Sequence, residues 1–128
     1  MTLGEYYNLS EIYAELNEKY FEKKLSLSIA WFGNKTRKAE RKRVLGAYDR
    51  SQKLIRIHRI LDDPAIPRYF FSYVVFHEML HDVFPPKRVF RKGWKIHHET
   101  FKKAEKSFQD YALAKYWEKN HRNLFFNQ

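Results

Sequence analysis

Apolar side chains recur at intervals of three and four residues near the start of the chain, which is the spacing of one helix face. They are Leu9, Ile12, Tyr13, Leu16 and Tyr20. Asn8 or Ser10 can cap such a helix by accepting its first backbone N–H groups, and the pattern ends near Lys23 or Lys24. A first helix with an inward apolar face is therefore predicted over this stretch.

The pattern then changes to a period of two, which is typical of strands with one buried face. Leu, Ile and Trp alternate with Ser and Ala from 25 to 31, and two further strands are predicted at 44–48 and 54–58. Residues 49–52 between these two strands suit a hairpin turn. His58, at the end of the last strand, is expected on the sheet surface rather than at a metal.

A nearly continuous apolar stretch at 69–83 predicts a buried helix. Pro67 suits the first turn of this helix, and the proline pair at 85–86 stops it. A last long helix is predicted from 96 to 119, where one face carries an inward stripe. The stripe consists of His97, Phe101, Ala104, Phe108 and Tyr111. The tail at 120–128 is expected to be irregular, with its apolar residues folded back onto the domain or into a cleft.

Three ionisable residues interrupt the apolar stretch: His77, Glu78 and His81. The two histidines are four residues apart, so they lie on one helix face and can bind the same metal ion. Glu78 lies one step round the helix, close enough to reach a metal-bound water. Zinc accepts imidazole nitrogens, and in catalytic sites it keeps one position for water. Ionisable groups in an apolar segment are costly without a purpose, so we favour a metal site over a chance occurrence of the pattern.

A third ligand is predicted at His97, because this residue begins the inward stripe of the last predicted helix. His98 lies about 100° round that helix and Glu99 about 200° round, so both are less well placed. Iron, cobalt and nickel also accept imidazole, and the motif favours zinc among them.

The composition suits one globular domain covering residues 1–128, with 44% hydrophobic residues. The absence of cysteine excludes disulfides and cysteine-ligated zinc modules. The chain begins without a signal-peptide pattern and has no apolar run long enough to cross a bilayer, so we expect a cytoplasmic, monomeric protein without a membrane partner. We expect an α+β fold in which a small antiparallel sheet of about three strands covers the motif helix.

The charge balance is strongly basic, with 25 Lys and Arg against 15 Asp and Glu, or +10 at pH 7. Basic residues concentrate in two predicted loops, at 35–43 and 87–95. Such an excess favours a polyanionic partner, nucleic acid first and an anionic membrane second, and DNA would bind through these two loops; the alternative is that the same residues are only a solubilising surface.

Several segments together match one protein family. They are Leu16-Asn17-Glu18-Lys19-Tyr20-Phe21, the strand ending in Trp31, the hairpin with Gly46 and Ile55-Arg56-Ile57, His77-Glu78-Met79-Leu80-His81, and His97-His98-Glu99-Thr100-Phe101. On these segments the chain resembles the SprT-like metallopeptidases, the group that includes the Spartan proteases, from roughly Tyr13 to Phe108. Aligning on Phe101 puts the family's third zinc ligand at His97. His98 stands where the family usually has glycine, and we expect no cysteine-rich zinc ribbon after the domain.

The resemblance implies a zincin-like minimal metallopeptidase domain with Zn²⁺ held by His77, His81 and His97. It implies a zinc endopeptidase that uses Glu78 as general base to cleave proteins bound or crosslinked to DNA. One alternative is a cytoplasmic metallopeptidase with no nucleic-acid role. The other is a nucleic-acid binding module with a structural zinc, which would have no need of Glu78. Candidates for the group that stabilises the oxyanion are Tyr48, Arg88 and Tyr111.

Overall fold

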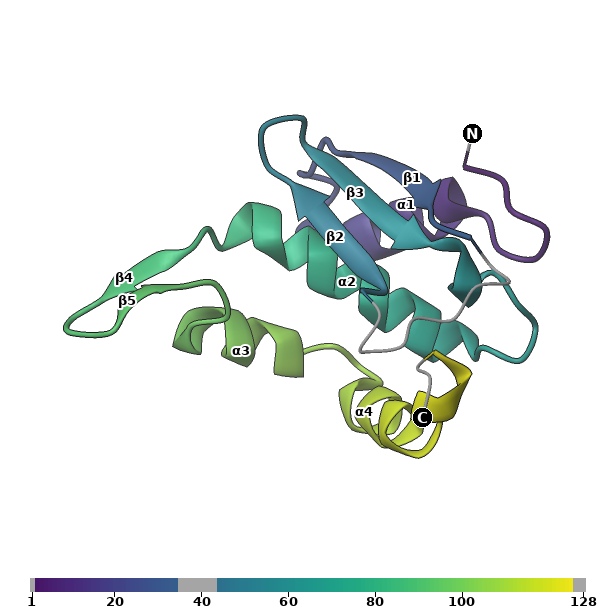
Figure 1. Cartoon of the computed structure of the whole chain (residues 1–128). Coiled ribbons are helices and arrows are strands. Elements are labelled where there is room, and N and C mark those ends of the chain that lie inside the picture. The colour runs from purple at the N-terminus through teal and green to yellow at the C-terminus, as the bar shows by residue number, and fades with distance from the viewer. Residues whose placement is uncertain (1, 35–43, 126–128) are drawn as a thin grey trace.

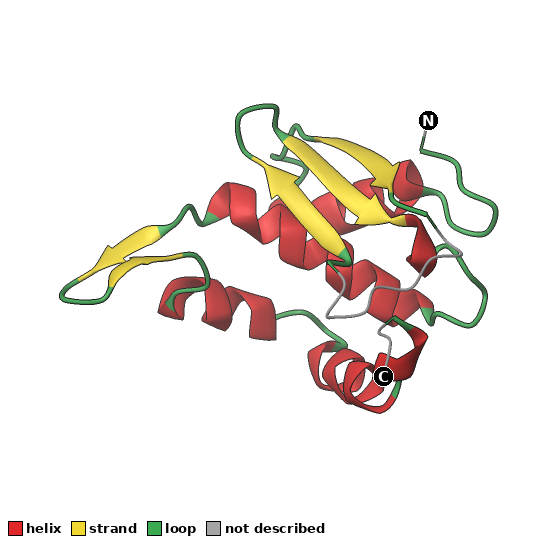
Figure 2. Cartoon of the chain, in the orientation of Figure 1, coloured by secondary structure: helices red, strands yellow, loops and turns green. Residues whose placement is uncertain are grey.

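Helices and strands form an α+β arrangement in which a small sheet covers one side of a layer of helices (Figure 2). The structure is a computed structural model, and it describes residues 2–34 and 44–125. Within these ranges no helix has the length and apolar character that a membrane crossing requires.

Helix α2 (Arg68–Val83) lies between the sheet on one side and two later helices on the other (Figure 1). It contacts α1 (Leu9–Phe21), α3 (Glu99–Lys106) and α4 (Tyr111–Asn120), as well as two strands of the sheet. Ten of its 16 residues are buried, which agrees with the apolar stretch in the sequence. The prediction of a buried helix that begins after Pro67 and ends before the proline pair is confirmed.

Helix α1 begins where the sequence predicts, but it ends at Phe21, slightly before the predicted end near Lys23 or Lys24. The side chain of Asn8 accepts the backbone N–H groups of Ser10 and Glu11, so Asn8 is the cap. At the other end Glu22 adopts a left-handed conformation with φ of 53°. The Asn17 side chain then holds the departing chain, because it donates to the carbonyl of Leu25 at 2.9 Å and accepts its N–H at 3.2 Å.

The three-stranded sheet has the order β1-β3-β2, with β1 (Ser28–Phe32), β2 (Gly46–Asp49) and β3 (Leu54–His58). Strands β2 and β3 form the predicted antiparallel hairpin, but β1 runs parallel to β3. The prediction of an all-antiparallel sheet is therefore wrong for β1, which also begins later than predicted. Parallel neighbouring strands need a long connection between them. The chain between β1 and β3 includes β2, and it is long enough for this crossover.

His58 is buried rather than lying on the sheet surface, so the prediction for this residue is wrong. Its side chain is 6% exposed, and its Nδ1 accepts the backbone N–H of Ile60 at 3.0 Å. The ring thus caps the short 3₁₀ helix that follows β3, at Arg59–Leu61. This capping role needs no metal.

A second, two-stranded sheet replaces the predicted basic loop at 87–95. Strands β4 (Lys87–Val89) and β5 (Gly93–Lys95) pair antiparallel, and the turn between them has positive φ at Arg91 and Gly93. The hairpin extends away from the rest of the molecule, at the left of Figure 1. The other predicted basic loop, at 35–43, lies outside the described residues.

The last long helix predicted for 96–119 is two helices, α3 and α4, separated by a turn. The Ser107 hydroxyl donates to the Ala104 carbonyl at 2.5 Å, and the N–H of Gln109 donates to the Tyr20 hydroxyl at 3.0 Å. Phe108, within the turn, is buried against Phe76 and Tyr20. The helix therefore ends at a tertiary contact, the packing of Phe108, and the buried apolar face of this segment continues past the break.

The C-terminal segment folds back onto the domain. After α4 the chain forms a short 3₁₀ helix at Arg122–Leu124, and Phe125 is 1% exposed. The Phe125 ring lies 6.1 Å from that of Phe70 on α2 and 6.0 Å from that of Trp117 on α4. Of the two positions left open by the sequence, the structure shows this residue on the core; residues 126–128 lie outside the described range.

Candidate metal centre

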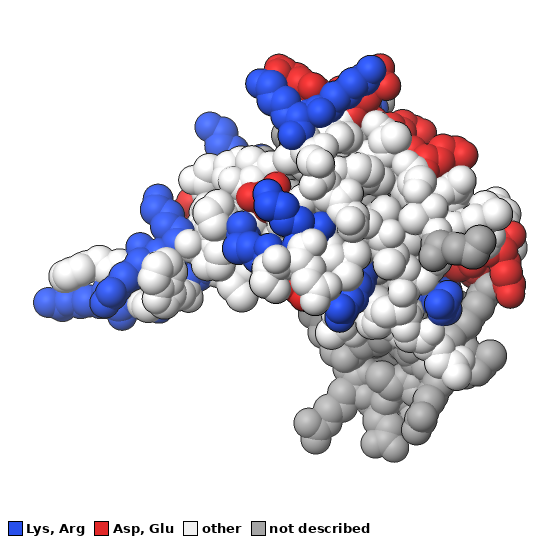
Figure 3. Space-filling view, turned by 90° about the horizontal axis from the view of Figure 1, so that it is seen from above, with Lys and Arg blue, Asp and Glu red and all other residues white. Residues whose placement is uncertain are grey.

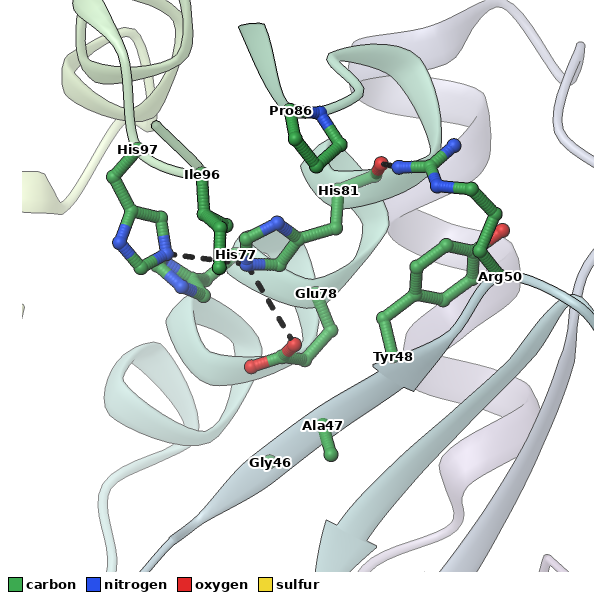
Figure 4. Close-up of a pocket in the computed structure, with 10 residues that line it drawn as sticks. All are labelled: Gly46, Ala47, Tyr48, Arg50, His77, Glu78, His81, Pro86, Ile96 and His97. Atoms are coloured by element: carbon green, nitrogen blue, oxygen red, sulfur yellow. Dashed lines mark hydrogen bonds and ion pairs between the residues drawn. The ribbon is translucent and has the colours of Figure 1, made fainter. Parts of the chain in front are cut away.

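Three histidines converge in the cleft between α2 and the edge of β2 (Figure 4). One nitrogen of each of His77, His81 and His97 lies within 4.8 Å of the other two. The Nε2 atoms of His81 and His97 are 3.2 Å apart, and the three ring centroids are separated by 4.9–5.0 Å. These residues are close enough to hold one metal ion.

His97 belongs to the segment between β5 and α3, and not to a helix as predicted. Phe101, in the first turn of α3, fixes this segment because its side chain is fully buried. The Phe101 ring lies 5.2 Å from the ring of His77, 4.7 Å from His81 and 4.9 Å from His97. His97 therefore lies beside the other two histidines, as predicted, but the buried Phe101 ring places it there rather than helical spacing.

His98 turns away from the three-histidine cluster. Its side chain is 7% exposed, and its Nε2 lies 3.1 Å from the carbonyl oxygen of Pro85, to which it donates. His98 also precedes the first residue of α3 as its N-cap. The structure therefore places His97, and not His98, beside His77 and His81.

The environment favours neutral imidazoles, which is the form that binds a metal. Burial, and then the neighbouring His77 and His97, lower the pKa of His81 to about 3. Burial and then His77 also lower the pKa of His97. Neutral rings direct nitrogen lone pairs toward one another, and a bound cation would remove the repulsion between these lone pairs. The donor set of three imidazoles fits zinc.

Glu78 lies beside the cluster with its carboxylate facing the cleft (Figure 4). Its side chain is 7% exposed, and its Oε1 is 4.0 Å from Nε2 of His81. Burial raises the pKa of Glu78 from 4.5 to about 7; the charge of Glu105 also raises it, whereas His77 lowers it. Such a carboxyl group exchanges a proton near neutral pH, as a general base requires.

Gly46 of β2 permits the sheet to pass close to Glu78. A Cβ at position 46 would lie 3.0 Å from Oε2 of Glu78, 3.1 Å from its Cγ and 3.2 Å from Cγ1 of Val74. A larger residue would press on the carboxylate and on a buried valine. The glycine therefore sets the distance between the edge of the sheet and the candidate base.

Glu105 is a residue of the site that sequence reasoning missed. Its Oε2 lies 2.5 Å from Nδ1 of His77, on the side of the ring away from the cluster. Burial raises the pKa of Glu105, but hydrogen bonds from His77 and Tyr73 and the charge of Lys115 leave it below its usual value. A sequence signal existed, because Glu105 is four residues after Phe101 and so shares its helix face.

The cluster opens into a cleft that runs along the edge of β2. One cavity of about 390 Å³ borders the cluster, and a second of about 570 Å³ shares four of its residues. The shared residues are Gly46, His77, Glu78 and His97. The first cavity continues past Tyr48 and Arg50 toward Pro86 and Ile96 at the base of the hairpin. The cleft therefore has space for an extended polypeptide on either side of the histidine cluster.

The three candidates for stabilising an oxyanion are not directed at the cluster. Tyr48 lines the first cavity, but its hydroxyl donates to Asp82 at 2.5 Å and points away from the histidines (Figure 4). Arg88 on β4 and Tyr111 on α4 line neither of the two cavities. Arg50 lines the first cavity, and its guanidinium donates to the backbone carbonyl of His81.

Comparisons with protein-family models, with curated proteins and with solved structures found no match to this chain. The functional argument consequently depends on the chemistry of the site itself. That chemistry consists of three converging imidazoles, a buried carboxyl group beside them and an open cleft.

Proposed function

We propose that this chain is a zinc-dependent endopeptidase with a zincin-like fold, in which His77, His81 and His97 hold the metal. The observation that carries this proposal is the Glu78 carboxyl group, which is buried beside the histidine cluster and faces an open cleft. A structural zinc site is closed by its ligands and has no use for a further carboxylate at its open side.

Bound zinc would supply a water of lowered pKa and would polarise the carbonyl of the scissile bond. Glu78 takes a proton from the attacking water and gives it to the leaving amine, so it acts first as general base and then as general acid. In the metal-free protein, burial already raises the pKa of Glu78 to about 7, so the group can both accept and release a proton. Phe101 beneath the three rings holds them in register and excludes water from that side.

Strand β2 offers an edge along which an extended peptide can bind. Among the described residues β2 pairs only with β3, so its other side faces the cleft. The carbonyl of Leu45 accepts the N–H of His58, and bonded pairs alternate along an antiparallel ladder. The backbone groups of Gly46 and Tyr48 therefore point to the open edge. A substrate added there as a further strand would pass Glu78.

The test of this function combines metal analysis with cleavage of an unfolded protein. We expect about one zinc per chain, loss of cleavage with a chelator and its return with added zinc. Glu78→Gln should retain zinc and abolish cleavage. Glu18→Gln, which removes an exposed acidic group of α1 that lines neither cavity, is the matched control and should cleave normally. Unchanged cleavage by Glu78→Gln would refute the mechanism.

The hairpin β4–β5 supports DNA-bound proteins as the substrate class. Lys and Arg gather on the hairpin, at the left of Figure 3, and the segment has no acidic residue. Its cations are Lys87, Arg88, Arg91, Lys92 and Lys95. Phe90 is 85% exposed and Trp94 68% exposed, and aromatic rings beside cations suit contact with nucleic-acid bases and phosphates. DNA held there would lie near the cleft.

This substrate class is tested by titrating single- and double-stranded DNA at several salt concentrations. Lys92→Glu should weaken binding and reduce the salt dependence by about one phosphate contact. Lys103→Glu, on the exposed side of α3, is the control. If neither DNA nor salt affects cleavage, the protein is a metallopeptidase without a nucleic-acid role. If the zinc-loaded protein binds DNA but cleaves no unfolded substrate, the structural-zinc alternative holds.

A further inference from the structure

Glu105 connects α3 to the metal-binding face of α2. Its Oε2 lies 2.5 Å from Nδ1 of His77, and the two residues are 28 positions apart in the sequence. Both side chains are largely shielded from solvent, with 14% of Glu105 and 24% of His77 exposed. A hydrogen bond between ionisable groups in such a place is stronger than its counterpart on an open surface.

The contact fixes which nitrogen of His77 faces the cluster. In a neutral imidazole one nitrogen donates and the other accepts. Because the carboxylate is the acceptor, the proton lies on Nδ1 and the lone pair lies on Nε2. The Nε2 atom is thereby directed to the side where His81 and His97 meet. Without an acceptor behind the ring, both tautomers and both ring orientations would be open to His77.

Glu105 is itself held in place by residues of two helices. The hydroxyl of Tyr73, one turn before His77 on α2, also hydrogen-bonds the Glu105 carboxylate. Tyr73 is 5% exposed, so this hydroxyl comes from the core. Lys115 of α4 lies over the Tyr73 ring, 5.8 Å from its centroid, and adds a positive charge nearby. The carboxylate therefore has a fixed position from which to orient His77.

We propose that Glu105 is a positioning residue of the metal centre, which sets the tautomer and the direction of His77 and thereby raises the affinity for zinc. The proposal rests on the proposed function for the identity of the metal. A carboxylate behind a metal-binding imidazole also makes the ring a stronger ligand, and its charge partly offsets that of a divalent cation.

The decisive measurement is zinc affinity by competition with a chelator of known strength, using the full chain. Glu105→Ala should weaken zinc binding by about 10- to 100-fold. Glu105→Gln, which keeps an oxygen acceptor but loses the charge, should weaken it less. Glu18→Ala and Glu18→Gln are matched controls, because Glu18 is an exposed carboxylate of α1 that lines neither cavity. Both controls should bind zinc as the wild type does.

A second measurement separates positioning from a merely structural role. In metal-free protein, ¹⁵N shifts of the imidazole should show His77 with its proton on Nδ1, and Glu105→Ala should lose this preference. If Glu105→Ala does not fold, Glu105→Gln carries the affinity test. Wild-type zinc affinity and an unchanged His77 tautomer in these variants would overturn the proposal. If the wild type binds no zinc, the proposed function fails, while the tautomer measurement still decides the role of Glu105.

Discussion

Glu78→Gln is expected to stabilise the metal-free protein at high pH, although it removes the proposed catalytic base. Glu78 is 7% exposed, and burial raises its pKa from 4.5 to about 7. The unfolded chain ionises this group more readily than the folded one, so ionisation favours unfolding. The penalty is nearly absent below pH 4.5, grows between pH 4.5 and 7, and is complete above pH 7. Between pH 5 and pH 8 it amounts to about 2.5 kcal/mol.

The assay is urea unfolding of wild type and variant in a chelator, at pH 5 and at pH 8. The free energy of unfolding of Glu78→Gln minus that of the wild type should be about 2.5 kcal/mol larger at pH 8 than at pH 5. Any constant cost of burying the glutamine amide cancels in this comparison. Glu118→Gln is the control, since Glu118 forms a partly exposed ion pair with Lys115. Its relative stability should change by less than about 0.5 kcal/mol.

Equal pH dependence in the wild type and in Glu78→Gln would refute the reasoning. It would mean that folding does not desolvate the Glu78 carboxyl group enough to raise its pKa. Zinc provides a further check, because a nearby cation favours the carboxylate. The stability difference between the two proteins should therefore shrink when zinc is added at pH 8.

Four further predictions concern the surroundings of the site. Gly46→Ala, whose Cβ would lie 3.0 Å from Oε2 of Glu78, should lower the cleavage rate about tenfold while zinc affinity is retained. Tyr48→Phe should leave kcat within about threefold but lower stability by about 1 kcal/mol in urea unfolding, because its hydroxyl bonds Asp82 and not the cluster. Phe125→Ala should destabilise the protein by about 3–5 kcal/mol by the same assay, because the ring is buried. Zinc should slow amide hydrogen exchange in α3 about tenfold more than in α1, as measured by mass spectrometry.

The motif helix was predictable because its signal is local. A continuous apolar stretch bounded by prolines defines α2, and two histidines four residues apart must share one of its faces. The cap at Asn8 was one of two options, and the structure selects it through hydrogen bonds to Ser10 and Glu11. In each case the prediction depends only on residues that are close together in the sequence.

The direction of β1 and the break between α3 and α4 were not predictable from periodicity. Alternation shows which residues of a strand are buried, but it does not identify the partner strand or its direction. A break that preserves the apolar face is equally hidden, since Phe101 of α3 and Phe108 of the turn after α3 are both buried. The hairpin β4–β5 was missed because its strands are short and mostly exposed, so no buried face marks them.

The third histidine shows a correct residue reached by an incorrect route. His97 was predicted from helical spacing, but it precedes α3 and comes to the cluster because Phe101 is buried beneath all three rings. The partner of His77 was not predicted at all. The spacing from Phe101 puts Glu105 on the inward face of α3, but its partner is identified only when α3 and α2 are known to pack together, since the hydrogen bond spans 28 residues of sequence.

The two halves of the centre differ in how firmly the fold holds them. Helix α2 buries ten of its 16 residues, whereas α3 buries only Phe101 of its eight. His77 and His81 are therefore placed by the core, while His97 depends on one aromatic ring and on the contact of Glu105 with α2. Metal binding would join the halves, so part of its free energy would dock α3 rather than fill a rigid site. A chain with the same motif helix but without the buried ring at 101 would keep two ligands and lose the third.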